Sequence, residues 1–338
     1  MNVLIRCDSS NIIGTGHVMR MLNLCEYYPN YKFTFLCRNF KMNISNKILE
    51  KNYNLILLDY VIEPELDNYR TWIGKEYKDE INEFKNIVDT NLFDIIIIDH
   101  YGIDYLLEKQ ISTYTDRLFV ITDIFDFNHY CHIFINYSSE DLERNKKINL
   151  NPDTIYKIGY NNIILNKKFI TSTKKTIFND TFKKIVINMG GSDPPNFSLK
   201  ILKVINDYVI SNNIKVFIII GKSNNNIESI KEYICSKQNF NLLFDLNYDD
   251  LIKLYLDCDL TIGTLSVTAF ERLVLKIPQI CLKIVENQLI QQLDEFNIVK
   301  LENLLDKIIN YSSKLIKSND TGVPNTMSLL TVLPNMSQ

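Results

Sequence analysis

The stretch MNVLIRCDSSNIIGTGHVMR, residues 1–20, has the pattern of a β-strand, a glycine-containing loop and the start of a helix. The apolar run Val3–Ile5 has the length of a strand, and the glycines after it permit a tight turn and close approach of the backbone to a ligand. The helix N-terminus that follows such a loop favours an anion or a polarised oxygen. The stretch therefore predicts an α/β unit whose first loop faces a ligand.

Short apolar runs alternate with longer amphipathic or polar stretches along the chain, which is typical of βαβ units with a parallel sheet. In the first half the runs are Val3–Ile5, Phe33–Leu36, Leu55–Leu58, Ile95–Ile98, Leu118–Ile121 and Ile133–Ile135. In the second half they are Lys184–Asn188, Val216–Ile220, Leu242–Phe244, Leu260–Ile262 and Gln279–Leu282. The sequence thus predicts an α/β protein of two Rossmann-like domains in series.

The length of 338 residues agrees with two domains of about 150 residues each. We expect an N-terminal domain over 1–165, a linker over 166–183, a C-terminal domain over 184–317 and a weakly ordered tail over 318–338. The linker prediction rests on a polar, threonine- and lysine-rich segment in which Thr171–Thr176 has almost no apolar content. The tail contains Ser, Asn, Thr and two prolines beside a brief apolar run.

Composition indicates a globular protein that carries no strong electrostatic field. Apolar residues make up 46% of the chain, charged residues 23%, and the net charge is −3, which disfavours nonspecific binding of nucleic acid or an anionic membrane. Arg6 and Asp8 interrupt the start of the chain where a signal peptide needs an apolar core, and no run approaches the ~20 residues of a membrane span. We therefore expect a cytoplasmic monomer without nucleic-acid or membrane partners.

The cysteine and histidine spacings argue against a metal centre. The 7 cysteines are scattered and form no CxxC pair, which favours reduced, partly buried thiols over disulfides or a zinc cluster. His129 and His132 have no acidic motif beside them, which favours a packing or surface role. We expect neither a metal nor a cofactor.

His17 is the candidate general base of the first domain. Its loop is not a Walker loop, because no Gly-Lys-Ser/Thr follows, and it departs from G-x-G-x-x-G because no glycine occupies the third glycine position. An imidazole at the mouth of a site, with a pKa near ~6.5, can take a proton at cellular pH. His17 could instead cap the helix or fill space.

Asp8 and Asp99 lie at the carboxyl ends of two predicted strands, where doubly wound folds collect ligand contacts. Asp99 belongs to the segment IIIIDHYGID, residues 95–104. Each carboxylate could orient His17, hold substrate hydroxyls or cap the next helix. We expect the neighbouring His100 to be structural.

In the second half, NMGGSDPPN, residues 188–196, again follows a strand with glycines, a hydroxyl and a carboxylate. This pattern would place backbone N–H groups and Ser192 where they can meet a phosphate or a sugar hydroxyl. The alternative is a turn in which Asp193 caps the next helix.

The segment LTIGTLSVTAFERLVLKIPQI, residues 260–280, predicts strand, loop, helix and strand. Ser266, Thr268 and the helix N-terminus could hold a diphosphate, and the carboxylate of Glu271 could accept two ribose hydroxyls. Glu271 could instead be a capping-box residue.

These motifs resemble the UDP-2,4-diacetamido-2,4,6-trideoxy-β-L-altropyranose hydrolases of pseudaminic acid biosynthesis, and more broadly the glycosyltransferase B superfamily. The match covers about residues 1–290 in order. Its segments are RCDSSNIIGTGHVMR, which is the most specific, then IIIIDHYGID, TDIFD, INYSS, NMGGSDPPNFSLKIL, GTLSVTAFER and VENQ. The resemblance implies two Rossmann-like domains that face each other across a cleft, and release of the diacetamido-trideoxy sugar from UDP in a pathway that serves flagellin glycosylation.

The resemblance also implies that His17 activates water for attack at C1 with inversion, without a metal. It assigns further residues to the two ends of the substrate. On the sugar side these are Asp8, Gly14, Gly16, Arg20, Asp99 and Tyr101. On the UDP side these are Gly190, Gly191, Ser192, Ser266, Val267, Glu271, Asn287 and Gln288.

One departure from the family pattern concerns the phosphate contacts. Many relatives carry Gly-Gly-Ser just before the superfamily glutamate, where this chain has Thr264-Leu265-Ser266-Val267. Three other functions fit the same motifs: an inverting UDP-sugar glycosyltransferase in which His17 deprotonates an acceptor hydroxyl, a hydrolase of another UDP-diacetamido sugar, and a nonenzymatic nucleotide-sugar sensor.

Overall fold

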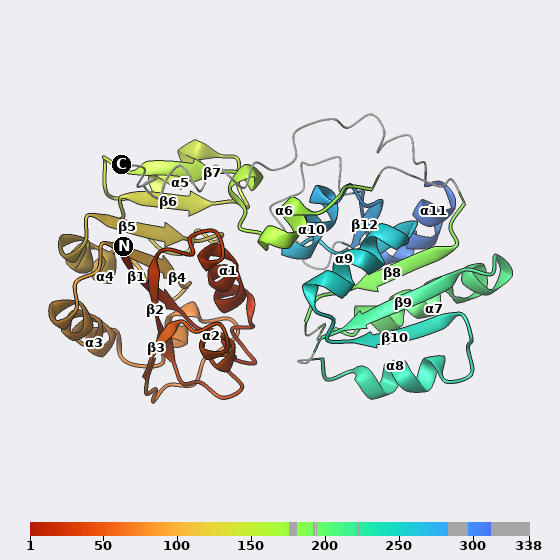
Figure 1. Ribbon diagram of the computed structural model, residues 1–338, viewed down its shortest axis with the longest axis horizontal. Coiled ribbons are helices and arrows are strands. Elements are labelled where there is room, and N and C mark those ends of the chain that lie inside the picture. Colours follow the sequence, from red (N-terminus) through yellow and green to blue (C-terminus); the bar gives the residue numbers. More distant parts are fainter. Residues whose placement is uncertain (176–180, 192, 194, 222–223, 283–296, 312–338) are drawn as a thin grey trace. The chain divides into compact units, whose positions relative to one another are not determined.

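The computed structural model describes residues 1–175, 181–191, 193, 195–221, 224–282 and 297–311. The chain divides into two compact units, the first containing Met1–Asn166 and the second Lys167–Val323 (Figure 1). Three of the predicted UDP-side residues, Ser192, Asn287 and Gln288, and the predicted tail over 318–338, lie outside the described residues.

The first unit is built on a parallel sheet of 7 strands in the order β3-β2-β1-β4-β5-β6-β7. The strands are β1 (Asn2–Cys7), β2 (Lys32–Arg38), β3 (Asn54–Leu58), β4 (Ile95–Asp99), β5 (Arg117–Ile121), β6 (Ile133–Asn136) and β7 (Ile155–Ile158). The helices are α1 (Gly16–Cys25), α2 (Asn46–Glu50), α3 (Tyr77–Thr90), α4 (Tyr105–Ile111) and α5 (Leu142–Lys147), with 3-10 turns η1 (Tyr69–Ile73), η2 (Ser112–Tyr114) and η3 (Tyr160–Asn162).

Helices cover both faces of this sheet, so its central strands are buried throughout. Alternate residues of β1 point to opposite sides: Val3 and Ile5 pack with the apolar face of α1, whereas Leu4 packs with residues of α3 and α4. Burial on both faces explains why the strand sequences are continuous apolar runs, such as the four isoleucines of β4.

The second unit repeats the architecture on a parallel sheet of 6 strands in the order β10-β9-β8-β11-β12-β13. Its strands are β8 (Lys184–Asn188), β9 (Lys215–Ile220), β10 (Phe240–Phe244), β11 (Leu260–Thr264), β12 (Gln279–Leu282) and β13 (Ile298–Val299). Its helices are α6 (Lys167–Thr171), α7 (Phe197–Ser211), α8 (Ile227–Ile234), α9 (Tyr248–Asp257), α10 (Val267–Val274) and α11 (Leu304–Ile309), with the 3-10 turn η5 (Leu301–Asn303).

Two separate clusters form the core of this unit, one on each face of the sheet. Ile185 and Ile187 of β8 pack with residues of α7, α8 and α11, while Val186 packs with residues of α6 and α9. Helix α6 falls within the segment expected to be a linker, and its Phe169 is fully buried.

Every strand predicted from an apolar run is present, and two strands were not predicted. Strand β7 lies at the edge of the first sheet, and Lys157 interrupts its apolar residues, so it has no continuous apolar run. Strand β13 has only 2 residues. The α/β architecture and the division into two sheets are therefore confirmed.

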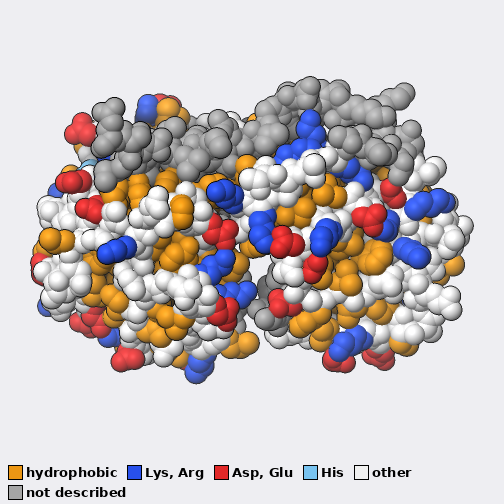
Figure 2. Space-filling model, viewed as in Figure 1, with side chains coloured by type: hydrophobic (Ala, Val, Ile, Leu, Met, Phe, Trp, Pro, Cys, Tyr) orange, Lys and Arg blue, Asp and Glu red, His pale blue; other side chains and the backbone are white. Residues whose placement is uncertain are grey.

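The surface in view carries both acidic and basic side chains on each unit, as Figure 2 shows. No helix in the described part of the chain is long and apolar enough to cross a membrane. The cysteines are free thiols, and all except Cys235 are buried.

Candidate active site

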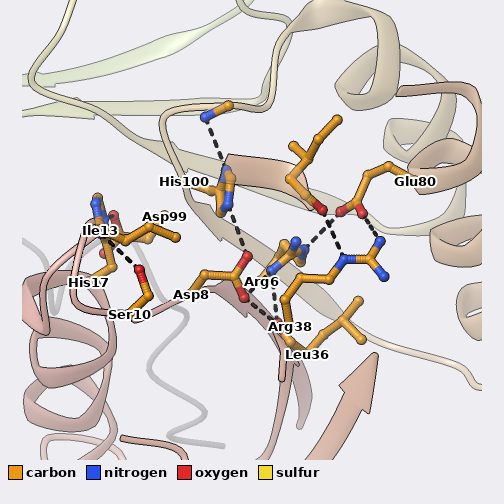
Figure 3. A network of polar contacts seen from close by, with 12 residues as sticks. Arg6, Asp8, Ser10, Ile13, His17, Leu36, Arg38, Glu80, Asp99 and His100 are labelled. Atoms are coloured by element: carbon orange, nitrogen blue, oxygen red, sulfur yellow. Dashed lines mark hydrogen bonds and ion pairs between the residues drawn. The ribbon is translucent and has the colours of Figure 1, made fainter. Parts of the chain in front are cut away.

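A short, internally bonded loop places His17 in the first turn of α1. Ser10 and Gly14 exchange backbone hydrogen bonds, with the Gly14 N–H donating to the Ser10 carbonyl at 2.9 Å. The Ser10 hydroxyl oxygen also accepts from the backbone N–H of Ile13 (Figure 3). It accepts from the backbone N–H of Ile12 as well. Gly14 has φ of +80°, a left-handed conformation that glycine adopts without strain. The loop thus joins the end of β1 to the start of α1 and places His17 at the second residue of that helix.

His17 and Asp99 form a hydrogen-bonded dyad. The Nδ1 atom of His17 lies 2.7 Å from Oδ1 of Asp99, and only 6% of the His17 surface is exposed. A carboxylate only accepts hydrogen bonds, so Nδ1 carries the hydrogen of this contact, and the tautomer that this contact selects has its lone pair on Nε2. No residue in the described ranges hydrogen-bonds Nε2. The geometry is that of an oriented base with its accepting nitrogen available.

Arg20, one turn further along α1, holds the other partner of the dyad. Its Nε donates to Oδ2 of Asp99 at 2.8 Å, and its Nη2 donates to Oδ1 at 2.5 Å. Burial by itself would raise the pKa of Asp99, but Arg20 and then His17 hold that pKa well below its usual value. Asp99 therefore stays ionised and can stabilise a positive charge on His17.

The strand order explains why these residues meet. Strands β1 and β4 are neighbours, with Cys7 aligned to Asp99, although they are far apart in sequence. The connections run outward to either side from this pair, so it is the topological switch point of the sheet. Doubly wound folds bind ligands at the carboxyl ends of the strands at this point.

Aromatic rings surround the dyad. The Tyr101 ring lies edge-on to the His17 ring with centroids 4.6 Å apart, and Trp72 stacks on Tyr101 at 5.6 Å. Tyr69 packs against both Trp72 and Tyr101, at 5.0 and 5.4 Å. Sequence reasoning identified Tyr101 but missed Tyr69 and Trp72, which reach the site from the 3-10 turn η1. The only signal was that Trp72 is the single tryptophan of the chain.

A polar network connects Tyr101 to Arg20. Both Tyr101 and Tyr137 donate hydroxyl hydrogen bonds to the carboxylate of Asp123, and Arg20 Nη1 donates to the Tyr137 hydroxyl at 2.5 Å. Burial raises the pKa of Tyr101 and of Tyr137, so both hydroxyls stay protonated. Asp123 and Tyr137 were not singled out as site residues, although they lie in the TDIFD and INYSS segments.

Asp8 lies in a separate buried cluster, as Figure 3 shows. Its Oδ1 accepts from the backbone N–H of Arg38 at 2.6 Å and pairs with Arg6 at 2.8 Å, while its Oδ2 accepts from Nε2 of His100 at 3.0 Å. His100 also accepts from the Gly102 N–H through Nδ1. The Asp8 side chain is fully buried with both oxygens engaged, so its contacts are with the protein interior. His100 has the structural role expected of it.

In the second unit the predicted glycine loop follows the central strand β8. Gly190 has φ of +88°, and no atom of the described residues lies within 4 Å of where a Cβ would stand on Gly190 or Gly191. Gly221, after β9, approaches this loop so closely that a Cβ on it would lie 2.5 Å from the Gly191 carbonyl oxygen. Asp193 caps α7, because its carboxylate accepts the backbone N–H groups of Phe197 and Ser198, each at 2.8 Å.

The second predicted loop of this unit joins β11 to α10, and β11 is the neighbour of β8 at the switch point of the second sheet. Ser266 is the N-cap residue of α10 but makes no side-chain capping bond, and Val267 is the first helical residue. The hydroxyls of Thr264, Ser266 and Thr268 form a chain with oxygen separations of 2.9 and 3.0 Å. The loop therefore gathers three hydroxyls at a helix N-terminus.

Glu271 lies on α10 beyond the capping-box position, which is Ala269 counted from Ser266. Its side chain is 5% exposed, and no hydrogen bond or ion pair joins it to another described residue. Burial raises the pKa of Glu271 to about 8, an effect that Arg272 partly opposes. The capping-box alternative is therefore wrong, and within the described part of the chain no side chain occupies the carboxyl group.

The remaining histidines serve the fold of the first unit. His129 pairs through Nδ1 with Glu108 at 2.8 Å, and His132 accepts the Leu118 N–H at 2.9 Å. Within the described ranges, no group of three or more His, Cys, Asp or Glu side chains is arranged to hold a metal ion.

Comparison with curated proteins supports the resemblance seen in the motifs. The chain is 25% identical over 288 residues to the UDP-2,4-diacetamido-2,4,6-trideoxy-beta-L-altropyranose hydrolase of Campylobacter jejuni, covering 85% of this chain and 93% of that protein. It is 23% identical over 290 residues to the spore coat polysaccharide biosynthesis protein SpsG of Bacillus subtilis, covering 85% and 79%. No protein-family model matches the chain.

Solved structures with the same fold include Staphylococcus aureus MnaA with UDP, with a TM-score of 0.63, 9% identity and coverage of 98% of this chain and 95% of that one. The UDP-GlcNAc 2-epimerase of Neisseria meningitidis has a TM-score of 0.56 and 13% identity, with coverage of 98% of this chain and 99% of that one. Acinetobacter baumannii MurG has a TM-score of 0.54 and 10% identity, with coverage of 98% of this chain and 91% of that one. The chain thus has a glycosyltransferase B-type fold and resembles in sequence a hydrolase of a UDP-linked diacetamido sugar.

Proposed function

We propose that this protein hydrolyses UDP-2,4-diacetamido-2,4,6-trideoxy-β-L-altropyranose to UDP and the free sugar, as a step of pseudaminic acid biosynthesis. The observation that carries the proposal is the dyad of His17 and Asp99, with Nε2 of the imidazole available. The similarity to the Campylobacter jejuni hydrolase, over 85% of this chain, supports the substrate.

In the proposed reaction Nε2 of His17 accepts a proton from water while the water oxygen attacks C1 of the sugar. The C1–O bond breaks, its electron pair leaves with the β-phosphate of UDP, and attack opposite the leaving group inverts the anomeric carbon. Asp99, which stays ionised beside Arg20, stabilises the imidazolium that forms. The reaction needs no metal, because backbone N–H groups and side-chain donors stabilise the departing diphosphate.

On the sugar side we propose that Tyr101 and the exposed backbone at Gly14 and Gly16 contact the substrate, joined by the Tyr69–Trp72 aromatic pair. Apolar ring faces suit the methyl groups of two acetamido substituents and of a 6-deoxy carbon. We assign Asp8 and Arg20 to positioning, since their polar atoms are engaged with other residues of the protein.

On the nucleotide side we propose that the loop at Gly190 and Gly191 and the N-terminus of α10 bind the diphosphate, and that Glu271 accepts the ribose hydroxyls. A helix N-terminus binds anions through its free N–H groups. Val267 belongs to this first turn. Ser192, Asn287 and Gln288 complete the proposed UDP side.

The test is phosphorus and proton NMR of the protein with the UDP-diacetamido-trideoxy-altrose substrate, in EDTA and without any acceptor. Release of UDP and a sugar of inverted anomeric configuration is the expected result. Intact substrate after long incubation would reject the proposal. Hydrolysis that stops when EDTA is added would reject the metal-free mechanism.

Replacement of the proposed base tests the role of His17 in the reaction. His17→Asn should lower kcat by about 10²–10⁴, the usual contribution of a general base, while leaving the Kd of UDP within about twofold. Steady-state kinetics and calorimetric titration with UDP measure the two effects. A variant that keeps the full rate would remove His17 from the mechanism.

A further inference from the structure

The second unit contains a fully buried arginine without an acidic partner. Arg6, Arg38 and Arg272 are each 0% exposed. Arg6 pairs with Asp8 and Glu80, at 2.8 and 2.9 Å, and Arg38 pairs with Glu80 and with Glu83. Among the described residues, no carboxylate lies within ion-pair distance of Arg272.

Neutral groups surround the Arg272 guanidinium. Its Nε donates to Oε1 of Gln279 at 2.9 Å, its Nη1 donates to Oγ1 of Thr268 at 3.3 Å, and its Nη2 donates to the Thr264 carbonyl at 3.3 Å. The guanidinium packs on the backbone of Gly263, where a Cβ would lie 2.7 Å from Nη1. The side chain is therefore held in place through hydrogen bonds that do not neutralise its charge.

A buried charge without a counter-ion is unfavourable, and proteins ordinarily pair such groups. Glu271 is the next residue along the chain, but its carboxyl group is not within ion-pair distance of Arg272. Burial raises the pKa of Glu271 to about 8, so that carboxyl group is mostly uncharged at neutral pH. Among the described residues, no ionised carboxylate therefore balances the charge of Arg272.

The hydroxyl chain connects Arg272 to the N-terminus of α10. Arg272 donates to Oγ1 of Thr268, and the Thr268 hydroxyl hydrogen can then point to Ser266, whose oxygen lies 3.0 Å away. The Ser266 hydrogen can then point to Thr264, at 2.9 Å, or to a ligand. Each donor in the chain is polarised by the one before it, which strengthens the last hydrogen bond.

We propose that Arg272 is a positioning residue for the diphosphate of the nucleotide, acting through Thr268 and Ser266, and that the bound diphosphate is its counter-ion. The inference rests on the proposed function for the identity of the nucleotide. It also accounts for Thr264-Leu265-Ser266-Val267 in place of the Gly-Gly-Ser of relatives: hydroxyls backed by a buried charge replace close approach of a glycine backbone.

The test is calorimetric titration of the full-length protein with UDP, with uridine and with inorganic pyrophosphate. The variants are Arg272→Met, Arg272→Lys, Thr268→Val and Ser266→Ala. The matched control is Thr261→Val, because Thr261 is buried on β11 but its hydroxyl bonds only the Pro278 carbonyl and is not part of the chain. Thr268→Val and Ser266→Ala keep the buried charge, so they remain informative if Arg272→Met does not fold.

Arg272→Met should weaken UDP and pyrophosphate by about tenfold or more while leaving uridine within about twofold, and Arg272→Lys should recover part of the loss. Thr268→Val and Ser266→Ala should also weaken the binding of UDP and pyrophosphate relative to that of uridine. Thr261→Val should leave these relative affinities unchanged. Equal weakening of uridine and UDP would show that Arg272 is merely structural. Unchanged UDP affinity in Thr268→Val and Ser266→Ala would overturn the relay.

The same titrations distinguish this inference from the proposed function. If the wild type binds pyrophosphate in an Arg272-dependent way but prefers another nucleotide to UDP, the proposed function fails and the diphosphate site stands. If the wild type binds UDP tightly and every variant keeps that affinity, the diphosphate inference fails and the proposed function stands.

Discussion

At the scale of single residues, the dyad works because each nitrogen of the His17 ring has a different environment. Asp99 holds Nδ1 and leaves Nε2 as the acceptor, and Arg20 holds Asp99 in turn. A neutral amide in place of the carboxylate would keep the shape but lose the charge that stabilises the imidazolium, and it would no longer fix the tautomer.

Asp99→Asn should therefore lower kcat by about 10²–10⁴ with little change in the Kd of UDP. Steady-state kinetics of the variant measure the effect. Asp94→Asn is the control, because Asp94 accepts from the Asn2 backbone N–H far from the dyad, and it should keep the wild-type rate. Equal rates for Asp99→Asn and the wild type would mean that His17 needs no oriented partner.

Glu271 makes the stability of the protein depend on pH. The folded-state pKa of about 8 lies above the ordinary glutamate value of 4.5, so between these values the folded chain keeps a proton that the unfolded chain releases. This group's contribution is thus fully present below the lower value and is lost as the pH rises through the higher one. The slope approaches ~1.4 kcal/mol per pH unit.

Glu271→Gln should flatten that slope. Urea unfolding of the wild type and the variant, repeated at pH values between the two pKa values, measures the free energy of unfolding of the second unit. The wild type should lose stability with rising pH faster than the variant does. Parallel curves would show that the carboxyl group is ionised in the folded protein.

At the scale of elements, two glycines of one loop serve different purposes. Gly14 has φ of +80°, which a residue with a side chain adopts only with strain. Gly16 has no such conformation, and no atom of the residues that the structure describes lies within 4 Å of the place that a Cβ on Gly16 would take. Gly14→Ala should cost about 1–2 kcal/mol of unfolding free energy, and Gly16→Ala should cost nothing or stabilise slightly.

Thermal unfolding compares the two variants directly. If substrate approaches the backbone at Gly16, its variant should also raise KM while the melting temperature is unchanged. Equal destabilisation by both substitutions would contradict the assignment of Gly14 to the loop's own geometry.

The strands that sequence patterns predicted are those that contain a continuous apolar run. Ile95–Ile98 is recognisable because parallel central strands need apolar residues at every position. Strand β7 could not be recognised the same way, since Lys157 interrupts its apolar residues. Helix α6 was hidden because the segment around it is polar, although Phe169 is buried.

The candidate site was predictable only residue by residue. Loop chemistry singled out His17 and Glu271, but the contact between His17 and Asp99 depends on β1 lying beside β4, and a single sequence does not give the strand order. Arg272 gave no signal, because its lack of an acidic partner is a property of the packed structure. Trp72 reaches the site from a 3-10 turn without a periodic pattern.

At the scale of the whole molecule, each unit has its own sheet and its own core clusters on both faces. Independent cores predict two calorimetric transitions instead of one. UDP should raise the temperature of one transition only, the one that belongs to the second unit, by an amount equivalent to about 2.7 kcal/mol at a ligand concentration 100 times Kd.

Differential scanning calorimetry with and without UDP checks this. Glu271→Ala should diminish the shift, because the variant loses the proposed contact of Glu271 with the ribose. A single transition, or a shift shared by both, would show that the two units unfold as one cooperative body.

The place of β1 in its sheet has a consequence for local motion. β1 is hydrogen-bonded on both sides, to β2 and to β4, and its residues are almost completely buried. Its amide hydrogens should exchange with solvent only when the whole unit opens, on the slowest timescale of the first unit. The loop that follows β1 is joined by a few local bonds and should exchange orders of magnitude faster. Solvent exchange would thus change abruptly within a few residues of Asp8, so that a fast-exchanging loop is anchored at the most persistent part of the unit.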